Sequence, residues 1–517
     1  MVSAISAAPS VTLSDVIDSH AFHRGDAVAV VDDATSTSWA QLAQWVSEMA
    51  DGLAARGVRR GDTVAVAAEL SVDYVALYYA TARIGAILVP LNWRLSDASV
   101  RSMLERTSPA LVIVGVERLT SVVGESAGEV LTDTPDATWG ERLRAPSATS
   151  VSPPSTIVDG DHPHLIIFTS GTTGTPKAAV LSQRSTMVDS YAGALASRLG
   201  PTDRLLTYQA PYHGGTWALI RQYLLVGPSV VLTRSFDATR VLGLIEQRRC
   251  TSFFAVPLVL KQLVESPDFG EFDLSSLRNV VFASYDPHSQ VMPIVEQLRL
   301  RGNPALTVEH IYGQTENSSL ITTSRPHQGE GGVSSVGRPV PGVRVSLRDG
   351  KGHEVGPGEI GEICVRSPSL MQGYLNDPQA TADVFRGGWL HTGDLGQLDA
   401  GGELSIVGRL KEMIRTAGVN VYPREVAEVL GKHPAVRDCA VFGVPDDRYD
   451  ERVVAAVVSS ESGLTPERLT AWVRERMAGY QTPRQVIFLD ALPKTAAGKT
   501  ATVELVAMAL RDMEGAS

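Results

Sequence analysis

Short apolar runs alternate with segments of helical periodicity through the first two thirds of the chain. Residues 62–69 form a strand-like run, residues 71–85 place apolar side chains at helical spacing, and residues 86–91 form another strand-like run. This alternation is typical of α/β architecture with largely parallel sheets. Three later runs continue the pattern: ALVIVG at 110–115, HLIIF at 164–168 and SVVLT at 229–233.

The pattern changes near residue 330, where short strands separated by Gly-rich turns predict an antiparallel β segment. Toward the C-terminus, helices and strands alternate again over roughly the last hundred residues, which is enough for a small domain. A chain of 517 residues also exceeds the size at which a single core stops growing. We therefore expect an α/β protein with a large N-terminal domain at 1–409 and a small, mobile C-terminal β/α domain at 410–517. The large domain would hold two parallel-type α/β sheets and a distorted β-barrel segment.

Composition narrows the classes of partner and the cellular compartment. The net charge of −11 argues against nucleic acid or an anionic membrane surface as the main partner. The most apolar window, 74–91, is interrupted by Arg83 and reaches Pro90, which indicates a buried helix running into a strand rather than a membrane span. No Lys or Arg precedes Arg24, so the basic region of a signal peptide is missing and we expect a cytoplasmic protein. The three cysteines show no metal-ligand spacing, and each is expected to be a small core residue in a reducing compartment: Cys250, Cys364 and Cys439.

The segment IFTSGTTGTPKAAVLS at 167–182 has the composition of an anion-binding loop. Its glycines allow backbone N–H groups to approach an anion, its Ser and Thr side chains add hydroxyl donors, and Lys177 adds positive charge. A Ser/Thr-rich surface loop is the alternative for these residues taken alone. A second segment, PKTAAGKT at 493–500, follows a strand and precedes a helix as a P-loop does, but it has Pro493 where that motif needs its first Gly. A short Gly turn that presents a lysine describes it better.

Six ordered motifs resemble those of the adenylate-forming superfamily, in its acyl- and aryl-CoA synthetase branch. They are the segment at 167–182, IYGQTE at 311–316, the segments at 361–378, 389–414 and 418–430, and PKTAAGKT at 493–500. Enzymes of this family activate a carboxylate by attack on the α-phosphate of ATP, which gives an acyl-adenylate and pyrophosphate. The acyl group then passes to the thiol of coenzyme A. Because nucleophile and phosphate are both anionic, such a site must supply positive charge and aligned donors.

The resemblance implies a role for each matching residue. Glu316 would bind Mg²⁺, Thr315 would contact the α-phosphate, and Lys499 would neutralise charge on the α-phosphate and the carboxylate. Asp394 would accept the ribose hydroxyls with help from Arg409. The remaining nucleotide contacts implied are Thr169, Ser170, Gly171, Thr172, Thr173, Gly174, Lys177, Tyr312 along the adenine, Gly313 and Gln314.

Relatives rotate the small domain between the two half-reactions, and Lys411 matches the hinge position. Gly418 matches a glycine beside the pantetheine tunnel, where a side chain would obstruct the thiol. Ala417 stands where many relatives have another Gly. The chain has no room for the insertion that marks ligases of carrier proteins between residues 316 and 392, which favours coenzyme A.

The acid is expected to be an aryl, alicyclic or medium-chain carboxylic acid. The stretch TYQAPYHGGTWALI at 207–220 lacks the Asp with which amino-acid-activating relatives bind an ammonium group. Four residues in it suggest a roomy apolar acyl pocket: Tyr212, Gly214, Gly215 and Trp217. His213 matches a gate beside the carboxylate, with a satisfied core histidine as the alternative.

Several residues depart from the family pattern close to ATP. Ser284, Tyr285 and Asp286 replace a small Gly/Ala-rich turn that borders adenine and the acyl group, and Gln183 replaces a common His. These changes keep open an enzyme that performs only the thioester step on an adenylate supplied by a partner enzyme. A luciferase-like oxygenase, a non-catalytic adenylate-binding protein and a homodimer also stay open.

Overall fold

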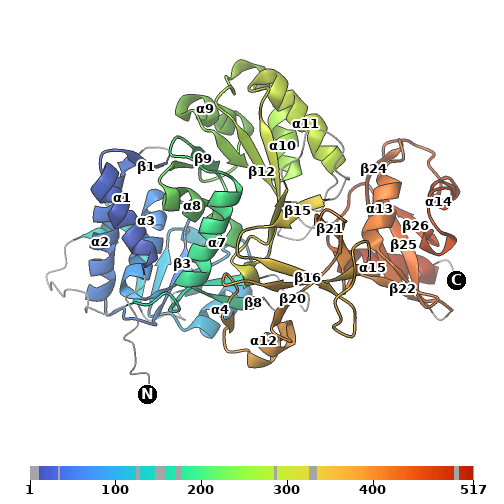
Figure 1. The fold of residues 1–517 in the computed structure, drawn as a ribbon, viewed down its shortest axis with the longest axis horizontal. Coiled ribbons are helices and arrows are strands. Elements are labelled where there is room, and N and C mark those ends of the chain that lie inside the picture. Colours follow the sequence, from blue (N-terminus) through green and yellow to red (C-terminus); the bar gives the residue numbers. More distant parts are fainter. Residues whose placement is uncertain are drawn as a thin grey trace. The chain divides into compact units, whose positions relative to one another are not determined.

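The computed structural model describes residues 11–32, 35–123, 129–145, 158–169, 176–283, 288–324, 335–446, 448–493 and 500–515. The chain forms two compact units (Figure 1). The first comprises Met1–Val345 and Val365–Leu390, and the second comprises Ser346–Cys364 and His391–Ser517. The chain passes between the units three times, each time inside a strand: β16 (Arg344–Arg348), β17 (Ile360–Arg366) and β20 (Trp389–Leu398).

Two largely parallel sheets build the first unit, as the apolar runs predict. In the first sheet the order is β18 (Gly373–Tyr374), β8 (Lys177–Ser182), β7 (Pro163–Thr169), β4 (Ile87–Pro90), β3 (Thr63–Ala67), β5 (Leu111–Val114) and β6 (Glu129–Thr132). The second contains β15 (Ser335–Pro339), β14 (Thr322–Ser324), β13 (Thr307–Tyr312), β12 (Asn279–Phe282), β11 (Ser252–Phe254), β9 (Arg204–Thr207), β10 (Ser229–Leu232), β1 (Val28–Val31) and β2 (Ser36–Ser38).

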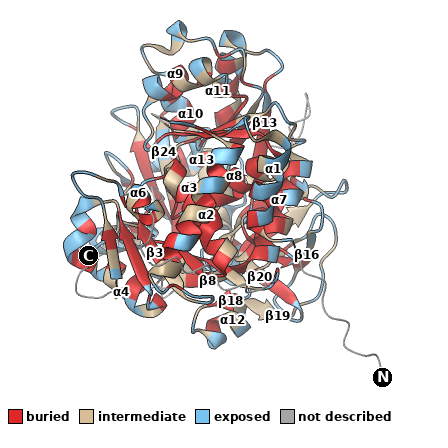
Figure 2. Cartoon of the chain, turned by 90° about the vertical axis from the view of Figure 1, so that its left-hand side faces the viewer, coloured by how far each residue is buried: buried red, intermediate tan, exposed pale blue. Residues whose placement is uncertain are grey.

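Helices cover both faces of these sheets, and Figure 2 shows buried residues concentrated in the strands and the helices between them. The central core joins both sheets to α1 (Leu13–Arg24), α2 (Trp39–Ala55), α3 (Val72–Ile84), α7 (Gln183–Ala196) and α8 (Gly214–Val226). A separate core lies under α4 (Asp97–Thr107) and α5 (Thr120–Val123). Another lies under α9 (Ala238–Arg248), α10 (Pro257–Val264) and α11 (His288–Arg301). Shorter elements are α6 (Trp139–Arg144), α12 (Pro378–Val384) and β19 (Phe385–Arg386), with 3₁₀ turns η1 (Glu117–Leu119) and η2 (Phe269–Glu271).

The most apolar window of the sequence is a buried helix followed by a strand, as predicted. Ser71 caps α3 by accepting a hydrogen bond from the Tyr74 amide, and Gly85 ends the helix with φ of 74°. The apolar run then continues into β4, whose residues are all buried. Among the residues that the structure describes, no helix combines the length and the apolar character that crossing a bilayer requires.

The second unit is smaller. It contains antiparallel strands that include β20 and β21 (Leu404–Arg409), and a separate sheet in the order β23 (Val419–Val421), β22 (Ile414–Thr416), β25 (Asp450–Ser459) and β24 (Val436–Asp446). Strand β26 (Gln485–Phe488) pairs with β25 in parallel. The remaining elements are α13 (Pro423–Gly431), α14 (Pro466–Arg474), η4 (Gly479–Gln481) and α15 (Thr502–Gly515). The expected α/β class, with large N-terminal sheets and a small C-terminal β/α part, is confirmed.

Candidate functional site

The two ends of the anion-loop segment lie side by side. Thr169 ends β7 and Lys177 begins β8, and the two residues are partners in the antiparallel register. The Thr169 hydroxyl donates a hydrogen bond to the Lys177 carbonyl at 3.3 Å. The hairpin therefore closes a loop between these strands. The predicted residues inside it lie outside the described part of the chain: Ser170, Gly171, Thr172, Thr173 and Gly174.

Tyr374 connects the lysine of this loop to the carboxylate of the IYGQTE motif. Its hydroxyl donates a hydrogen bond to Oε1 of Glu316 at 2.8 Å, and the Lys177 ammonium lies 4.8 Å from the centre of its ring. The Met371 amide donates to the Glu316 carbonyl at 2.9 Å. Burial, followed by the adjacent Glu316 charge, raises the pKa of Tyr374, so the phenol keeps its proton as a donor. A carboxylate, a phenol and a lysine are thus assembled where oxygen ligands could bind Mg²⁺ and the cation could bind phosphate.

The backbone around Glu316 is sharply folded. Thr315 and Glu316 lie in the 3₁₀ turn η3 (Thr315–Asn317), after Tyr312 ends β13. A Cβ atom on Gly313 would lie 1.6 Å from the Ser319 carbonyl oxygen, so only glycine fits there. Ser318 and Ser319 have φ of 58° and 129°, and such conformations cost about 1–3 kcal/mol each in non-glycine residues. The surrounding contacts must therefore hold this turn in place.

The predicted acyl-pocket residues begin α8 next to this turn. A Cβ atom on Gly214 would lie 3.6 Å from the Thr315 hydroxyl, so the start of the helix adjoins the IYGQTE motif. His213 is exposed, which excludes the core-histidine alternative. Tyr212 is buried and packs edge-on against Trp93 at 4.8 Å, a neighbour that the sequence motifs do not reveal.

Trp217 belongs to the core rather than to an open pocket. Its side chain is 0% exposed and stacks on Tyr78 with ring centres 4.3 Å apart. Its indole N–H donates to the Pro211 carbonyl at 2.7 Å, so it anchors the segment that leads into α8. The sequence holds a signal for this position, because Trp217, Ile220 and Leu224 follow helical spacing and all are buried.

Asp394 and Arg409 are brought together in the second unit. They are cross-strand partners on β20 and β21, with Nε of Arg409 3.2 Å from Oδ1 of Asp394. Glu362 supports this loop by accepting a hydrogen bond from the Gly393 amide at 3.2 Å. The Asp394 side chain is only 3% exposed, so its carboxylate is held in a fixed environment.

Glu362 also belongs to a cluster with Cys364 and His391. Nδ1 of His391 lies 2.7 Å from Oε2 of Glu362 and 3.4 Å from the Cys364 sulfur. The three potential ligand atoms lie within 4.8 Å of one another, and this set of donors could hold a divalent ion such as Zn²⁺. The 2.7 Å contact is equally that of a hydrogen-bonded pair. Cysteine spacing does not reveal the cluster, because His391 lies 27 residues beyond Cys364.

Ala417 and Gly418 form the two-residue loop between β22 and β23. Their φ angles are 51° and 79°, and positive φ at both positions is typical of the type I′ turn. An added Cβ on Gly418 would meet no atom of the described residues within 4 Å, so in this structure the backbone conformation alone favours glycine there. Ala417 has the less favourable side chain for its conformation.

Replacing Ala417 with Gly should therefore stabilise the hairpin by about 0.5–1 kcal/mol, since relief of left-handed strain exceeds the added entropy of the unfolded chain. Hydrogen exchange of peptides covering 414–421 measures this as slower exchange. Gly418→Ala is the matched control and should speed exchange instead. Equal exchange in Ala417→Gly and the wild type would contradict the assigned strain.

The remaining predicted positions carry less structural information. Lys411 is exposed between β21 and β22. Gln314 precedes η3. Lys499, Ser284 and Tyr285, together with Asp286, lie outside the described residues. Gln183 is 0% exposed and bonds the Leu13 amide and the Ala82 carbonyl, which makes it part of the packing between α7, α1 and α3.

Comparison with known proteins extends over nearly the whole chain. The model of the AMP-binding enzyme family matches residues 17–375, and that of its C-terminal domain matches residues 425–499. An indoleacetate–CoA ligase of Aromatoleum aromaticum is 36% identical over 94% of this chain and 96% of its own. A feruloyl-CoA synthase of Amycolatopsis is 35% identical over 92% and 94%. A fatty acid–acyl-carrier-protein ligase of Streptomyces coeruleorubidus is 32% identical over 96% of both chains.

Solved structures of similar proteins also match nearly the whole chain. An amide bond synthetase of Marinactinospora thermotolerans has a TM-score of 0.84 and 31% identity, covering 96% of this chain and 99% of its own. The O-succinylbenzoate coenzyme A synthetase of Bacillus subtilis, in complex with ATP and a magnesium ion, has a TM-score of 0.83 and 27% identity over 95% and 98%. With both family models matched in order along the chain, this protein belongs to the AMP-binding enzyme family and is an adenylate-forming ligase.

Proposed function

We propose that this protein is an ATP- and Mg²⁺-dependent acid:CoA ligase that forms an acyl-adenylate and then an acyl-CoA thioester. The observation that carries the proposal is the contact chain from Lys177 through Tyr374 to Glu316, beside Thr315 and the start of α8. A cation that could bind phosphate, a carboxylate that could bind Mg²⁺ and the start of α8 lie within one unit, which supports the proposal.

Each group has a role in this chemistry. Mg²⁺ bound through Glu316 would offset negative charge on the phosphates, while Thr315 and the loop from Thr169 to Lys177 orient them. Tyr312, Gly313 and Gln314 would line the nucleotide. Asp394 would accept the ribose hydroxyls, and its ion pair with Arg409 orients the carboxylate.

The second half-reaction would involve rotation of residues 410–517 about Lys411. That movement would withdraw Lys499 from the adenylate and bring the Ala417–Gly418 turn to the thiol of coenzyme A. The exposed position of Lys411 between two strands suits a hinge. The boundary that we propose between residues 409 and 410 is the hinge of this movement, and it does not coincide with the limits of the two compact units.

An aryl or arylalkanoic acid is the proposed substrate class. The stretch 207–220 offers no carboxylate for an ammonium group, and Tyr212 packs on Trp93 beside the start of α8. Relatives that match over nearly their whole length are an indoleacetate–CoA ligase and a feruloyl-CoA synthase. These observations together favour a flat, largely apolar acid.

The direct test is turnover with a panel of aryl, alicyclic and medium-chain acids. Pyrophosphate, AMP and acyl-CoA should form in equal amounts, and formation of ADP would contradict the mechanism. Offering coenzyme A, a carrier protein and an amine in parallel identifies the acceptor, since relatives include a carrier-protein ligase and an amide bond synthetase. Turnover only from a preformed adenylate would identify a thioester-forming enzyme. Light or O₂ consumption would identify an oxygenase, and tight binding without product a sensor.

Gly215→Leu should narrow the range of acids. An added Cβ at Gly215 would meet no described atom within 4 Å, so a leucine side chain can occupy the space beside the start of α8. We expect kcat/KM for an arylacetic acid to fall by at least about tenfold, because losing pocket space for one or two methylene groups typically lowers kcat/KM by that factor. Acetate and propionate, measured with the same variant, serve as the internal control. Equal losses for large and small acids would place Gly215 outside the acyl pocket.

A further inference from the structure

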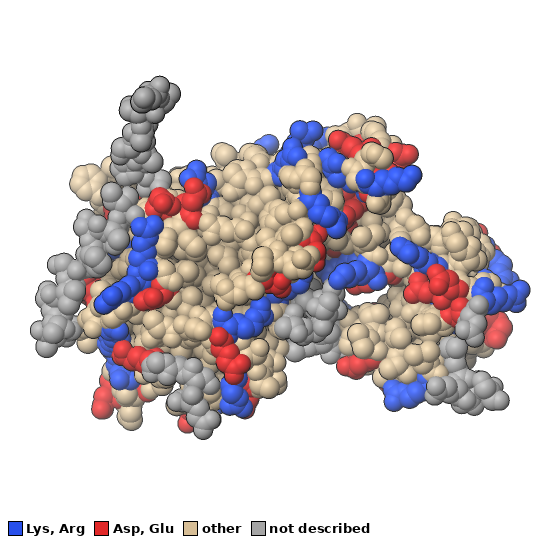
Figure 3. Space-filling model, turned by 90° about the horizontal axis from the view of Figure 1, so that it is seen from below, with Lys and Arg blue, Asp and Glu red and all other residues tan. Residues whose placement is uncertain are grey.

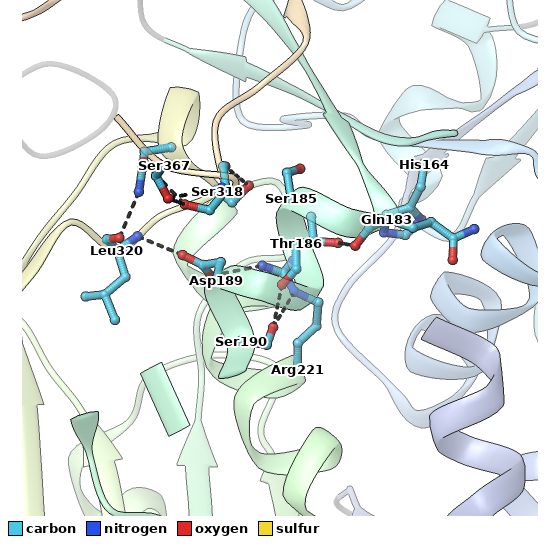
Figure 4. A network of polar contacts seen from close by, with 12 residues as sticks. His164, Gln183, Ser185, Thr186, Asp189, Ser190, Arg221, Ser318, Leu320 and Ser367 are labelled. Atoms are coloured by element: carbon cyan, nitrogen blue, oxygen red, sulfur yellow. Dashed lines mark hydrogen bonds and ion pairs between the residues drawn. The ribbon is translucent and has the colours of Figure 1, made fainter. Parts of the chain in front are cut away.

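A buried ion pair lies inside the first unit, next to the turn that carries Glu316 (Figure 4). Asp189 on α7 and Arg221 on α8 are 0% and 2% exposed, with Nη2 of Arg221 3.4 Å from Oδ2 of Asp189. Desolvation makes a buried ion pair weak evidence for stability, because apolar side chains of similar volume often replace one at no loss. The proposed chemistry gives this pair no direct role.

The second oxygen of Asp189 holds the strained turn. Oδ1 accepts a hydrogen bond from the Leu320 amide at 3.0 Å. This amide comes directly after Ser318 and Ser319, the two residues with positive φ. The Asn317 side chain donates to the Leu320 carbonyl at 2.8 Å, so both backbone groups of Leu320 are bound. Asp189 therefore satisfies a buried amide at the point where the chain leaves the turn.

Arg221 in turn fixes the direction of the Asp189 carboxylate. Its Nε donates to the Ser190 hydroxyl and its Nη1 to the Tyr78 hydroxyl, both at 3.1 Å. Tyr78 lies 2.7 Å from Nε2 of His164 on β7. The guanidinium is thus held directly from α7 and α3, and β7 contacts it only through Tyr78; Figure 4 shows the guanidinium beside Asp189 and Ser190.

We infer that Asp189, oriented by Arg221, is a positioning residue that holds segment 313–320 so that Thr315 and Glu316 meet the nucleotide and Mg²⁺. The expected effect on Mg²⁺ rests on the proposed function, whereas the expected effect on the segment rests on geometry alone. Asp189 lies outside every motif of the sequence, and its partner Leu320 is 131 residues away.

Protonation of Asp189 gives the arrangement a pH dependence. Burial raises the pKa of Asp189 to about 7, against the opposing effects of Arg221 and the Leu320 amide. The other titratable groups around the pair are Tyr78 and Tyr79 on α3 and His164 on β7. Burial raises the pKa of both tyrosines and lowers that of His164, so all three stay neutral near pH 7. Asp189 therefore loses its charge progressively as the pH falls through about 7, which weakens its attraction to Arg221.

Asp189→Asn tests the inference, with Glu309→Gln as the matched control. Glu309 is also a buried carboxylate of the first unit, but it bonds Ser197, Thr323 and Asn279, which lie outside segment 313–320. The full-length variants are compared by hydrogen exchange of peptides covering 313–321 and by the Mg²⁺ dependence of pyrophosphate release. Asp189→Asn should speed exchange in this segment and raise the half-saturating Mg²⁺ concentration about tenfold, the size of effect seen when a group supporting a metal ligand is lost. Glu309→Gln should change neither.

The pH profile separates positioning from a general loss of structure. Wild-type adenylation should decline as the pH falls through about 7, and Asp189→Asn should lack that step. Unchanged exchange in segment 313–320 would overturn the inference whatever the activity. If Asp189→Asn exchanged faster but the wild-type protein never released pyrophosphate, the geometric role would be upheld and the proposed function contradicted. Equal effects of both substitutions on exchange would also overturn it.

Discussion

Lys499→Ala should slow pyrophosphate release from acid and ATP by about a hundred- to a thousandfold, the usual cost of removing one group that stabilises charge in a transition state. The physical reason is that a carboxylate attacking an α-phosphate accumulates negative charge, which the ammonium group would neutralise. Conversion of a chemically made acyl-adenylate to acyl-CoA should continue at close to the wild-type rate, because the lysine would have left the site by then.

Lys432→Ala is the control for this substitution. Lys432 is an exposed lysine of the second unit whose ammonium lies 3.1 Å from Glu428 on the same helix surface, so its loss removes a similar charge without touching the proposed site. Both half-reactions should be unchanged in this variant. If Lys499→Ala slowed both half-reactions equally, the lysine would have a structural role or the domain would not rotate.

Glu316→Gln should reduce adenylation by about a hundredfold and shift it to much higher Mg²⁺ concentrations, because a neutral amide is a poorer ligand for a hard cation. Tyr374→Phe removes only the hydrogen bond to Oε1 of Glu316 and should raise the half-saturating Mg²⁺ concentration by about tenfold. The measurement is pyrophosphate release across a Mg²⁺ titration at saturating ATP.

The comparison between these two variants carries the test. A graded effect, larger for the ligand than for its supporting phenol, is expected of a metal site. The opposite result would be a Glu316→Gln variant whose activity excess Mg²⁺ does not restore at all, together with a fully active Tyr374→Phe. In that case Glu316 would not bind the metal and would act only in the fold of its turn.

Patterning along the chain predicts the fold well, because each signal it uses is local. The apolar window at 74–91 becomes α3 and β4 since its length, its interruption at Arg83 and its Pro90 all act within the segment. Figure 3 shows Lys and Arg side chains lying among Asp and Glu on the face that it draws.

The candidate site is predicted less completely, because its supporting contacts join distant segments. Tyr374 lies 58 residues from Glu316, and neither residue's surroundings indicate the hydrogen bond between them. Trp217 is one of the four residues that suggest an acyl pocket in the sequence, whereas its helical spacing matches its position on the buried face of α8. Gln183 likewise follows the phosphate loop in sequence but packs against α1 and α3. Motifs indicate candidate reacting groups, whereas the groups that hold them depend on tertiary packing.

The chain crosses between the two units three times, and the order of these crossings affects how the protein folds during synthesis. Residues 365–390 belong to the first unit but are made after residues 346–364 of the second. They supply β18, which pairs with β8, and Tyr374, which bonds Glu316. Domains generally fold as units while the chain emerges from the ribosome. A nascent chain halted before residue 365 would therefore carry β8 and Glu316 without their partners, and both contacts would form only once β18 has left the exit tunnel.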